Sequence, residues 1–459
     1  MRERDLTAEE ILDFAQRDES HFFDNKSSAV SGRKIQKIAA ALANADGGEF
    51  VVGIKDSKEE PDPAQRWDGV DSMEQLNFVF QTMHETNPQV PHQAEFLRCP
   101  QGSVALRIYV EKSETVHRTS GDVVYVRKGA QSLPLNNAEE IQSLQYAKGE
   151  SSYEDTIVRG ATAEDIFETD EMRTFLESYS PATDPVDFTI NQNLVDRTSY
   201  DPRTAGILLF SDNPVPLLPR RCGIKITRYE TDLEVPEREH MREQFTVEGA
   251  LYRQIHHASR IVTDLMESVR VMGPSGLVEA RYPPETIWEI LVNAVIHRDY
   301  SISDDIHILV FNNRIEIISP GRLPGYVTVE NILDARFSRN SKIVRTLNKY
   351  KDAPNRDMGE GLNTAFQRME EFRLERPVVR EHNNAVSVVI PHTPLASPQE
   401  RVMEFLEHNE KIRNREGRAI TGIKSENSMK RIFYELRDKA LIEPVYSENG
   451  KRIIAWKKI

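Results

Sequence analysis

Polar residues recur at every fourth position of one apolar segment, EILVNAVIHRDY (residues 289–300). If this segment is a helix, Glu289, Asn293 and His297 share one face, while isoleucine, leucine and valine cover the rest. Burying a carboxylate or an amide without hydrogen-bond partners costs about 1–3 kcal/mol, so this face needs polar partners. An Asn oxygen can hold Mg²⁺ together with phosphate, and a Glu one turn away can polarise a water for attack on a γ-phosphate. The spacing therefore predicts a nucleotide site; the alternative is a solvated stripe on a core helix.

Glycines downstream of this segment fit a phosphate-binding role. Gly321 lies in the stretch SPGRLP, and Gly359 and Gly361 lie in MGEGLNTA, just before a predicted helix. Glycine lets a backbone approach phosphate closely, and the N-terminus of a helix binds anions because its free amide groups point outward. The order of these motifs along the chain favours the nucleotide site over the solvated stripe.

These motifs resemble those of a known superfamily. EILVNAVIHRDYS, RIEIISPGRLP and MGEGLNTA are similar to the nucleotide-binding motifs of a divergent branch of the GHKL ATPases, which include gyrase, histidine kinases and MutL. The resemblance implies that Glu289 is the water-activating base and that Asn293 holds Mg²⁺ and phosphate. Ser319 and Pro320 stand where most members carry the aspartate that binds the adenine amino group, so the motif does not specify the purine.

The same resemblance implies further contacts to ATP: a glycine turn beside the adenine, a second that cradles the phosphates, and a lid above them. His297 and Arg298 follow the predicted helix directly, and the alternative for both is a pair with Asp299 or a helix cap. Beyond Glu289, the predicted nucleotide-binding residues are Asn293, His297, Arg298, Gly321, Arg339, Asn340, Gly359 and Gly361.

Three acidic residues near the N-terminus, Glu19, Asp24 and Asp56, flank predicted element boundaries. Three carboxylates can hold Mg²⁺ or Mn²⁺, activate water and offset developing phosphate charge. The pattern ES…FDNK…IAAALANADGGEFVVGIKD resembles the Schlafen AlbA_2 domain over residues 8–135, in which acids at these places hold metal for RNA cleavage. The resemblance implies that Lys26 contacts phosphate, although Asp-Asn-Lys stands here in place of the usual Glu-Phe-Lys. The alternatives are nucleic-acid or partner binding without cleavage, and a purely structural role.

The elements that must position these residues predict a multidomain α+β protein. The predicted segments are an AlbA_2-like nucleic-acid-binding domain (1–150), a bridging α/β region (151–280), a GHKL-like α/β sandwich (281–395) and a winged helix-turn-helix domain (396–459).

Local patterns predict individual elements within these segments. Thr7 to Glu10 form a capping box that starts a helix. The amphipathic stretch GRKIQKIAAALANA predicts a second helix, which ends at the Asp46-Gly-Gly turn before the β-branched strand EFVVGIKD. In the bridging region the apolar run GILLF (206–210) predicts a buried strand. Further on, strands DIHILVF and RIEIIS are joined at Asn312 and Asn313.

The last segment predicts three helices followed by a hairpin. Met429, Ile432, Phe433 and Leu436 give the third helix an apolar face, and Asn449-Gly450 is a strong hairpin turn. This order is typical of a winged helix-turn-helix, whose third helix reads base edges in the major groove; the alternative is a protein-interaction or dimerisation module. The candidate nucleic-acid contacts are Lys424, Ser425, Asn427, Ser428, Lys430 and Arg431 on or before the third helix, with Lys451 and Arg452 in the wing.

Composition favours a soluble, cytoplasmic protein. The net charge is −14, which excludes nonspecific coating of nucleic acid by the whole surface, yet residues 397–459 hold 14 Lys and Arg against 10 Asp and Glu. No apolar run approaches the roughly 20 residues needed to cross a bilayer, and the charged N-terminus lacks a signal-peptide core. The two cysteines, Cys99 and Cys222, make neither a disulfide framework nor a zinc site.

Three hypotheses follow from the domain order, which resembles bacterial and archaeal proteins labelled as predicted transcriptional regulators or ATP-binding proteins. The first is an ATP-controlled, nucleic-acid-binding transcription regulator with GHKL-type ATPase activity, acting as a homodimer or higher homo-oligomer. It would use ATP and Mg²⁺, and would bind DNA at the winged helix and either DNA or RNA at the AlbA_2-like domain. The second is an ATP-regulated, metal-dependent nuclease in anti-phage defence, with Mg²⁺ or Mn²⁺ at the N-terminal acids. The third is an interaction scaffold with a vestigial nucleotide site.

Overall fold

The computed structural model divides into two compact units of mixed α+β structure, residues 1–369 with 376–391, and residues 370–375 with 392–459. The structure describes residues 2–267, 269–273, 276–279, 282–355, 361–372, 374–382, 384–392, 398–421, 423, 425–447 and 453–459. The predicted α+β fold class is confirmed.

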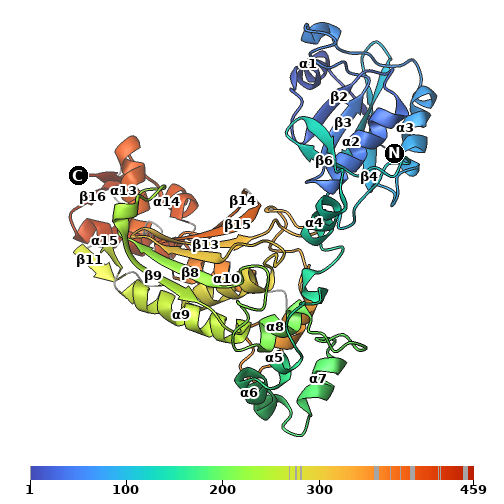
Figure 1. The fold of residues 1–459 in the computed structure, drawn as a ribbon. Helices are drawn as coiled ribbons and strands as arrows, with labels where there is room; N and C mark the ends of the chain where they lie inside the picture. The colour runs from blue at the N-terminus through green and yellow to red at the C-terminus, as the bar shows by residue number, and fades with distance from the viewer. Residues whose placement is uncertain are drawn as a thin grey trace. The chain divides into compact units, whose positions relative to one another are not determined.

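A five-stranded sheet forms the first part of the larger unit, in the order β1-β4-β5-β3-β2 (Figure 1). Its strands are β1 (Arg2–Asp5), β2 (Phe23–Lys26), β3 (Gly48–Val52), β4 (His92–Arg98) and β5 (Val104–Val110), and its helices are α1 (Ala8–Gln16), α2 (Gly32–Asn44) and α3 (Asn77–His84). Successive residues of a strand point to opposite faces, so Phe50 and Val52 pack with α2 and α3 while Val51 packs with α1. The sheet is therefore buried on both faces.

The ends of two helices follow their sequence signals. Thr7 and Glu10 form the predicted capping box of α1, with the Thr7 backbone amide 2.8 Å from the Glu10 carboxylate. Helix α2 ends at Asn44, and the chain turns through Asp46 and Gly47, whose φ of +76° suits glycine. A Cβ at Gly47 would lie 2.8 Å from the carbonyl oxygen of Val110, the last residue of β5, so the turn packs closely against the end of that strand.

A hairpin and a series of helices continue the larger unit. They are β6 (Tyr125–Lys128), β7 (Gln131–Pro134), α4 (Ala138–Lys148), α5 (Glu164–Phe167), α6 (Asp170–Tyr179), α7 (Pro185–Asn191) and α8 (Thr204–Phe210). The predicted strand at residues 206–210 is wrong, because GILLF lies in α8 and every residue of α8 is buried. A fully buried apolar run shows neither the two-residue nor the 3.6-residue period, so its sequence does not separate strand from helix.

Gly206 in α8 gives a first testable prediction. An added Cβ would lie 2.5 Å from Ile166 Cδ1 and 2.8 Å from the Leu194 carbonyl oxygen. Although alanine is the better helix former, we expect Gly206→Ala to lower the free energy of unfolding by about 1–3 kcal/mol, because overpacking forces neighbouring groups apart. Chemical denaturation measures the change. Gly121→Ala is the matched control, since its Cβ would meet only Thr119 Oγ1 at 3.9 Å; an equal loss in both variants would contradict the prediction.

A six-stranded sheet forms the second part of the larger unit, in the order β14-β15-β13-β12-β8-β9 (Figure 1). Its strands are β8 (Ile224–Tyr229), β9 (Met241–Val247), β12 (Ile306–Val310), β13 (Arg314–Pro320), β14 (Val378–His382) and β15 (Ala385–Pro391). The associated elements are α9 (Leu251–Glu267), β10 (Arg270–Gly273), β11 (Gly276–Glu279), α10 (Pro284–Ile296), α11 (Ser341–Leu347) and α12 (Gly361–Glu371). Strands β8 and β12 pair in parallel and the other neighbours are antiparallel.

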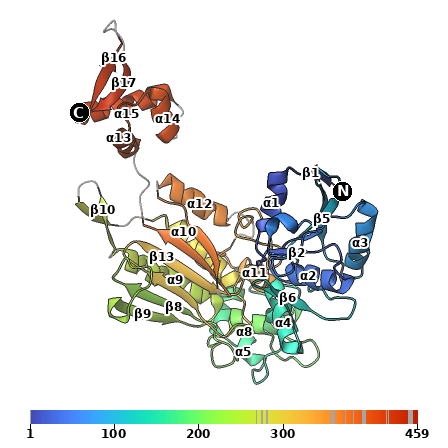
Figure 2. The same ribbon diagram turned by 90° about the horizontal axis from the view of Figure 1, so that it is seen from above.

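Helices α9 and α10 pack on each other and on this sheet, α9 against β8 and α10 against β13 (Figures 1 and 2). Strands β12 and β13 are joined at Asn312 and Asn313, as predicted. The sheet contains strands from before and after residue 280 in the sequence, where a domain boundary was predicted.

The smaller unit contains three helices and a two-stranded antiparallel sheet, in the predicted order. They are α13 (Pro398–His408), α14 (Asn414–Thr421), α15 (Glu426–Asp438), β16 (Ile442–Tyr446) and β17 (Ile453–Lys458). Met429, Phe433 and Leu436 are buried in its core, which confirms the predicted apolar face of the third helix. The predicted hairpin turn at Asn449-Gly450 lies outside the described residues. Within the part of the chain that the structure describes, no helix is both long and apolar enough to cross a bilayer.

Candidate nucleotide and nucleic-acid sites

Helix α10 carries the predicted polar face. Its apolar residues from Ile290 to Ile296 are buried, whereas Glu289 and Asn293 are partly exposed. Pro284 lies in the first turn, where its missing N–H leaves no hydrogen bond unmade. The four-residue spacing therefore marks a partly exposed strip between the buried apolar residues of α10.

The start of α12 lies against this strip. A Cβ at Gly361 would overlap Oε2 of Glu289 and would lie 3.8 Å from Nδ2 of Asn293. The two helices are also joined by Thr286 Oγ1, which donates to the Ala365 carbonyl oxygen at 3.0 Å. The structure thus brings Glu289, Asn293 and Gly361 together, with a bare backbone at the N-terminus of an eleven-residue helix facing a carboxylate and an amide.

This arrangement fits a magnesium–nucleotide complex. Asn293 and Glu289 offer the oxygen ligands that Mg²⁺ prefers, and the α12 N-terminus offers amide groups to phosphate. The absence of a side chain at Gly361 lets the Glu289 carboxylate lie directly against the backbone at the start of α12. Gly359, predicted to share the phosphate cradle, lies outside the described residues.

The residues that follow α10 are bonded within the fold. Burial, and then the charge of Arg339, lower the pKa of His297 to about 4, so its imidazole is neutral at neutral pH. Arg298 is fully buried and donates to the carbonyl oxygens of Arg221, at 2.5 Å, and Asp304. Asp299, the alternative partner considered for Arg298, forms an ion pair with Arg339 at 3.7 Å. Arg298 thus fixes the loop beyond α10.

Gly321, Arg339 and Asn340 lie together at the C-terminal end of α10. Gly321 has a φ of +111°, and a Cβ there would lie 2.5 Å from Arg339 Nη1. Asn340 is fully buried, and its Nδ2 donates to the carbonyl oxygens of Ile296 and Arg298 at 3.0 and 2.8 Å. These contacts tie the loop after β13 to the last turn of the helix that carries Glu289 and Asn293.

Two of the three predicted N-terminal acids lie together. The ammonium of Lys26 donates to Glu19 at 2.6 Å and also contacts Asp24. Burial, and then a hydrogen bond with Asp24, raise the pKa of Glu19. Burial favours the neutral form of Lys26, but the charges and hydrogen bonds of Asp24 and Glu19 outweigh it, so the pKa of Lys26 is raised. We call Glu19, Asp24 and Lys26 the acid cluster.

Arg127, on β6, completes this cluster and was not singled out from the sequence. Its Nη1 donates to Oδ2 of Asp24 at 2.7 Å, and its Nη2 donates to the Ser20 carbonyl oxygen at 2.8 Å. Asp56 instead closes a turn, accepting from the amides of Lys58 and Glu59 at 2.8 and 2.9 Å. Asp24 has a cation on each side, the buried Arg127 and the partly exposed Lys26, so it is poorly suited to be a metal ligand. Among the described residues, no group of three His, Cys, Asp or Glu side chains is placed to hold a metal ion.

The predicted recognition residues of the smaller unit lie on an exposed surface. Ser425 caps α15 by accepting from the Ser428 amide at 3.3 Å, and Asn427 in the first turn is exposed. Lys430 and Arg431 are exposed one turn further on. The first turns of α15 therefore present amide, hydroxyl and cationic groups outward. Lys424, Lys451 and Arg452 lie outside the described residues.

Two family models match the chain. Residues 19–136 match "Schlafen, AlbA_2", and residues 303–390 match HATPase_c_4, described as "Putative ATP-dependent DNA helicase recG C-terminal". The chain therefore combines a Schlafen AlbA_2 domain with an ATPase-like domain, which confirms both resemblances. The first match includes the acid cluster and Asp56. The second includes Gly321 and Gly361 but begins after α10, so the roles of Glu289 and Asn293 depend on the geometry described above.

No curated protein matches the chain. Among solved structures, the DIP2311 protein from Corynebacterium diphtheriae is 17% identical, with a TM-score of 0.42, covering 98% of this chain and 82% of that protein's chain.

Proposed function

We propose that this protein binds a Mg²⁺–nucleoside triphosphate, with ATP as the expected nucleotide, and uses it to control nucleic-acid binding as a transcription regulator. The observation that carries the proposal is the meeting of Glu289, Asn293 and Gly361 at the start of α12. The match to an ATPase-like domain beginning at residue 303 supports the same interpretation.

Each residue of the nucleotide site has a distinct role. Asn293 would hold Mg²⁺ through its side-chain oxygen, and the ion would neutralise charge on the phosphates. The backbone from Gly361 onward binds phosphate oxygens with the free amides of α12. Glu289, one turn from Asn293, accepts a proton from the attacking water. Nucleotide can control nucleic-acid binding only if it binds two conformations of the chain with different affinity. A nucleotide that binds both conformations equally does not shift the equilibrium between them.

Nucleic acid binding is proposed at two places. In the AlbA_2 domain, Lys26 and Arg127 each form an ion pair with Asp24. These cations support nucleic-acid binding more than metal-dependent cleavage. In the smaller unit, three helices followed by a hairpin support a winged helix-turn-helix, with α15 in the major groove.

Calorimetry of the full chain with Mg²⁺ and each common nucleoside triphosphate tests the nucleotide proposal. We expect heat of binding with at least ATP, and a flat titration with every nucleotide would overturn the proposal in favour of a scaffold. Labelled RNA and DNA incubated with Mn²⁺, with and without ATP, should remain intact. Cleavage products that disappear in Asp24→Asn would instead favour the nuclease.

The smaller unit gives a prediction about Arg431. Because a recognition helix reads bases from its N-terminal part, Arg431→Ala should weaken binding to a selected duplex DNA by about 1–3 kcal/mol. Fluorescence anisotropy over a range of salt concentrations measures this loss. Arg437→Ala, an exposed arginine in the last turn of α15, is the matched control and should have little effect. Salt-dependent DNA binding that persists without residues 397–459 would count against α15 as the reader.

A further inference from the structure

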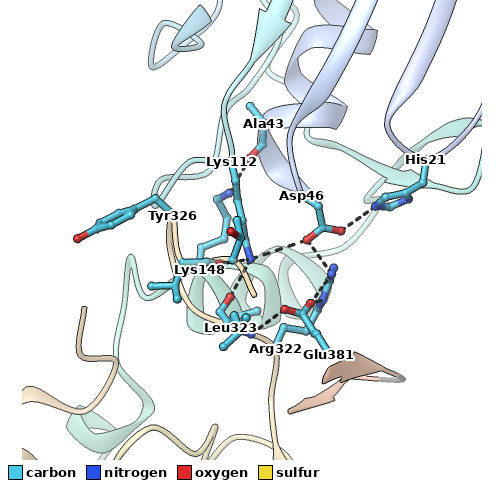
Figure 3. A network of polar contacts seen from close by, with 12 residues as sticks. His21, Ala43, Asp46, Lys112, Lys148, Arg322, Leu323, Tyr326 and Glu381 are labelled. Carbon is cyan, nitrogen blue, oxygen red and sulfur yellow. Dashed lines mark hydrogen bonds and ion pairs between the residues drawn. The ribbon is translucent and has the colours of Figure 1, made fainter. Parts of the chain in front are cut away.

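The loop after β13 joins the ATPase-like domain to the AlbA_2 domain through an ion pair (Figure 3). Arg322 Nη2 lies 2.7 Å from Oδ1 of Asp46, which occupies the turn after α2. Arg322 also pairs with Glu381 on β14. Burial acts against the charged form of Arg322, but Asp46 and Glu381 outweigh it and raise the pKa of Arg322. One arginine thus bonds to both domains.

Asp46 extends this contact to His21, which lies two residues from Glu19 and three residues from Asp24 in the sequence. Its second oxygen lies 2.7 Å from His21 Nε2, and His21 lies between Glu19 and Asp24 in the sequence (Figure 3). Burial tends to raise the pKa of Asp46, but its hydrogen bonds with Arg322 and His21 prevail and lower it. Asp46 is therefore an ionised link between the loop after β13 and the segment that holds Glu19 and Asp24.

A second set of contacts holds the same loop. Lys112, two residues beyond β5, donates to the carbonyl oxygens of Leu323 and Val327 at 2.9 and 3.0 Å. A Cβ at Gly149 would lie 2.6 Å from the ring of Phe337, and one at Gly325 would lie 2.9 Å from the same ring. The loop is thus held at both ends by residues of the AlbA_2 domain and of the segment just after it.

The loop reaches the nucleotide helix on its other side. Gly321 directly precedes Arg322 and packs on Arg339, and Asn340 donates to the carbonyl oxygen of Ile296, the last residue of α10, and to that of Arg298 just beyond it. A continuous series of contacts therefore runs from α10 through residues 321–340 to Asp46 and His21. Every contact in this series lies within the larger unit.

We propose that residues 321–340 couple nucleotide occupancy at α10 to the conformation of the acid cluster, with the Arg322–Asp46 ion pair as the coupling contact. The inference rests on the proposed nucleotide site and adds the route by which that site acts on the AlbA_2 domain. Coupling of this kind is reciprocal, so nucleic acid bound at the AlbA_2 domain changes nucleotide affinity by the same factor.

The test uses the full chain and two readouts. Hydrogen exchange at residues 19–26 is measured with and without Mg²⁺ and a non-hydrolysable ATP analogue, and the affinity for labelled RNA and DNA is measured under the same conditions. We expect the analogue to change exchange in the wild type and to change nucleic-acid affinity by about 5- to 150-fold, the usual range for coupled sites. Arg322→Ala and Asp46→Asn should each remove most of both effects, and the double variant should remove no more than either alone.

Arg242→Ala is the control, because Arg242, on the edge strand β9, forms an exposed ion pair with Glu230. This variant should respond to the analogue as the wild type does. A wild-type response retained in Arg322→Ala and Asp46→Asn would overturn the coupling role, and so would nucleotide binding that leaves residues 19–26 unchanged in the wild type. Absence of nucleotide binding in calorimetry would be a different result, since it would remove the nucleotide site itself.

Discussion

Replacing Glu289 by glutamine should lower the rate of ATP hydrolysis at the proposed nucleotide site by about 100- to 10,000-fold, the usual contribution of a general base, and should leave nucleotide bound. Glutamine keeps the size of the side chain beside Gly361 but cannot accept a proton from water. Single-turnover hydrolysis gives the rate, and calorimetry gives the dissociation constant. The effect should therefore fall on the chemical step alone.

Asn293→Ala is the companion variant, because it removes the oxygen assigned to Mg²⁺ one turn along the same helix face. We expect it to weaken Mg²⁺–nucleotide binding itself, so that the two variants separate catalysis from binding. If Glu289→Gln and Asn293→Ala both hydrolyse and bind ATP as the wild type does, the α10 face has no part in ATP chemistry. The scaffold would then be the better description.

Arg127→Ala should destabilise the AlbA_2 domain by about 3–5 kcal/mol, because removing one partner of a buried ion pair leaves the other charge uncompensated. The side chains of Arg127 and Asp24 are only 1% and 3% exposed. The substitution also removes donors from the carbonyl oxygens of Ser20 and Phe23. Hydrogen exchange of the β2 amides in the full chain measures this loss of stability at the strand that carries Asp24.

Arg118→Ala is the matched control for this prediction. Arg118 pairs with Asp122, which is 84% exposed, and exposed pairs contribute about 0–1 kcal/mol. Equal protection of β2 in Arg127→Ala and in the wild type would show that Asp24 needs only Lys26 as its cation. The ionised form of Asp24 would then depend less on Arg127 than the burial of this pair suggests. Metal binding by the acid cluster would regain support.

Local patterns predicted much of the fold and placed several residues of the proposed nucleotide site on their elements. Four-residue spacing located Glu289 and Asn293 on α10, and glycine chemistry pointed to Gly361, because each signal lies within a few residues. Arg127 could not be found in this way, since it meets Asp24 across 103 positions of sequence. Contacts between residues so far apart in sequence depend on the fold of the whole domain, and the pattern of a single segment does not predict them.

The same limit applies to the connection between domains. Arg322 and Asp46 are 276 positions apart, and each is an ordinary charged residue in a turn when its neighbours alone are considered. The sequence also placed a boundary at residue 280, although the parallel partner of β12 is β8, well before that residue. Parallel neighbours need a long crossover, so adjacent strands in such a sheet are often distant in sequence.

The parallel pairing of β8 with β12 has a practical consequence for expression of the ATPase-like domain. A truncated version beginning at residue 281 would lose β8, β9 and α9, and would leave one long side of β12 without hydrogen-bond partners. Bare strand edges recruit other chains and promote aggregation. A soluble fragment for crystallisation should therefore begin upstream of Ile224.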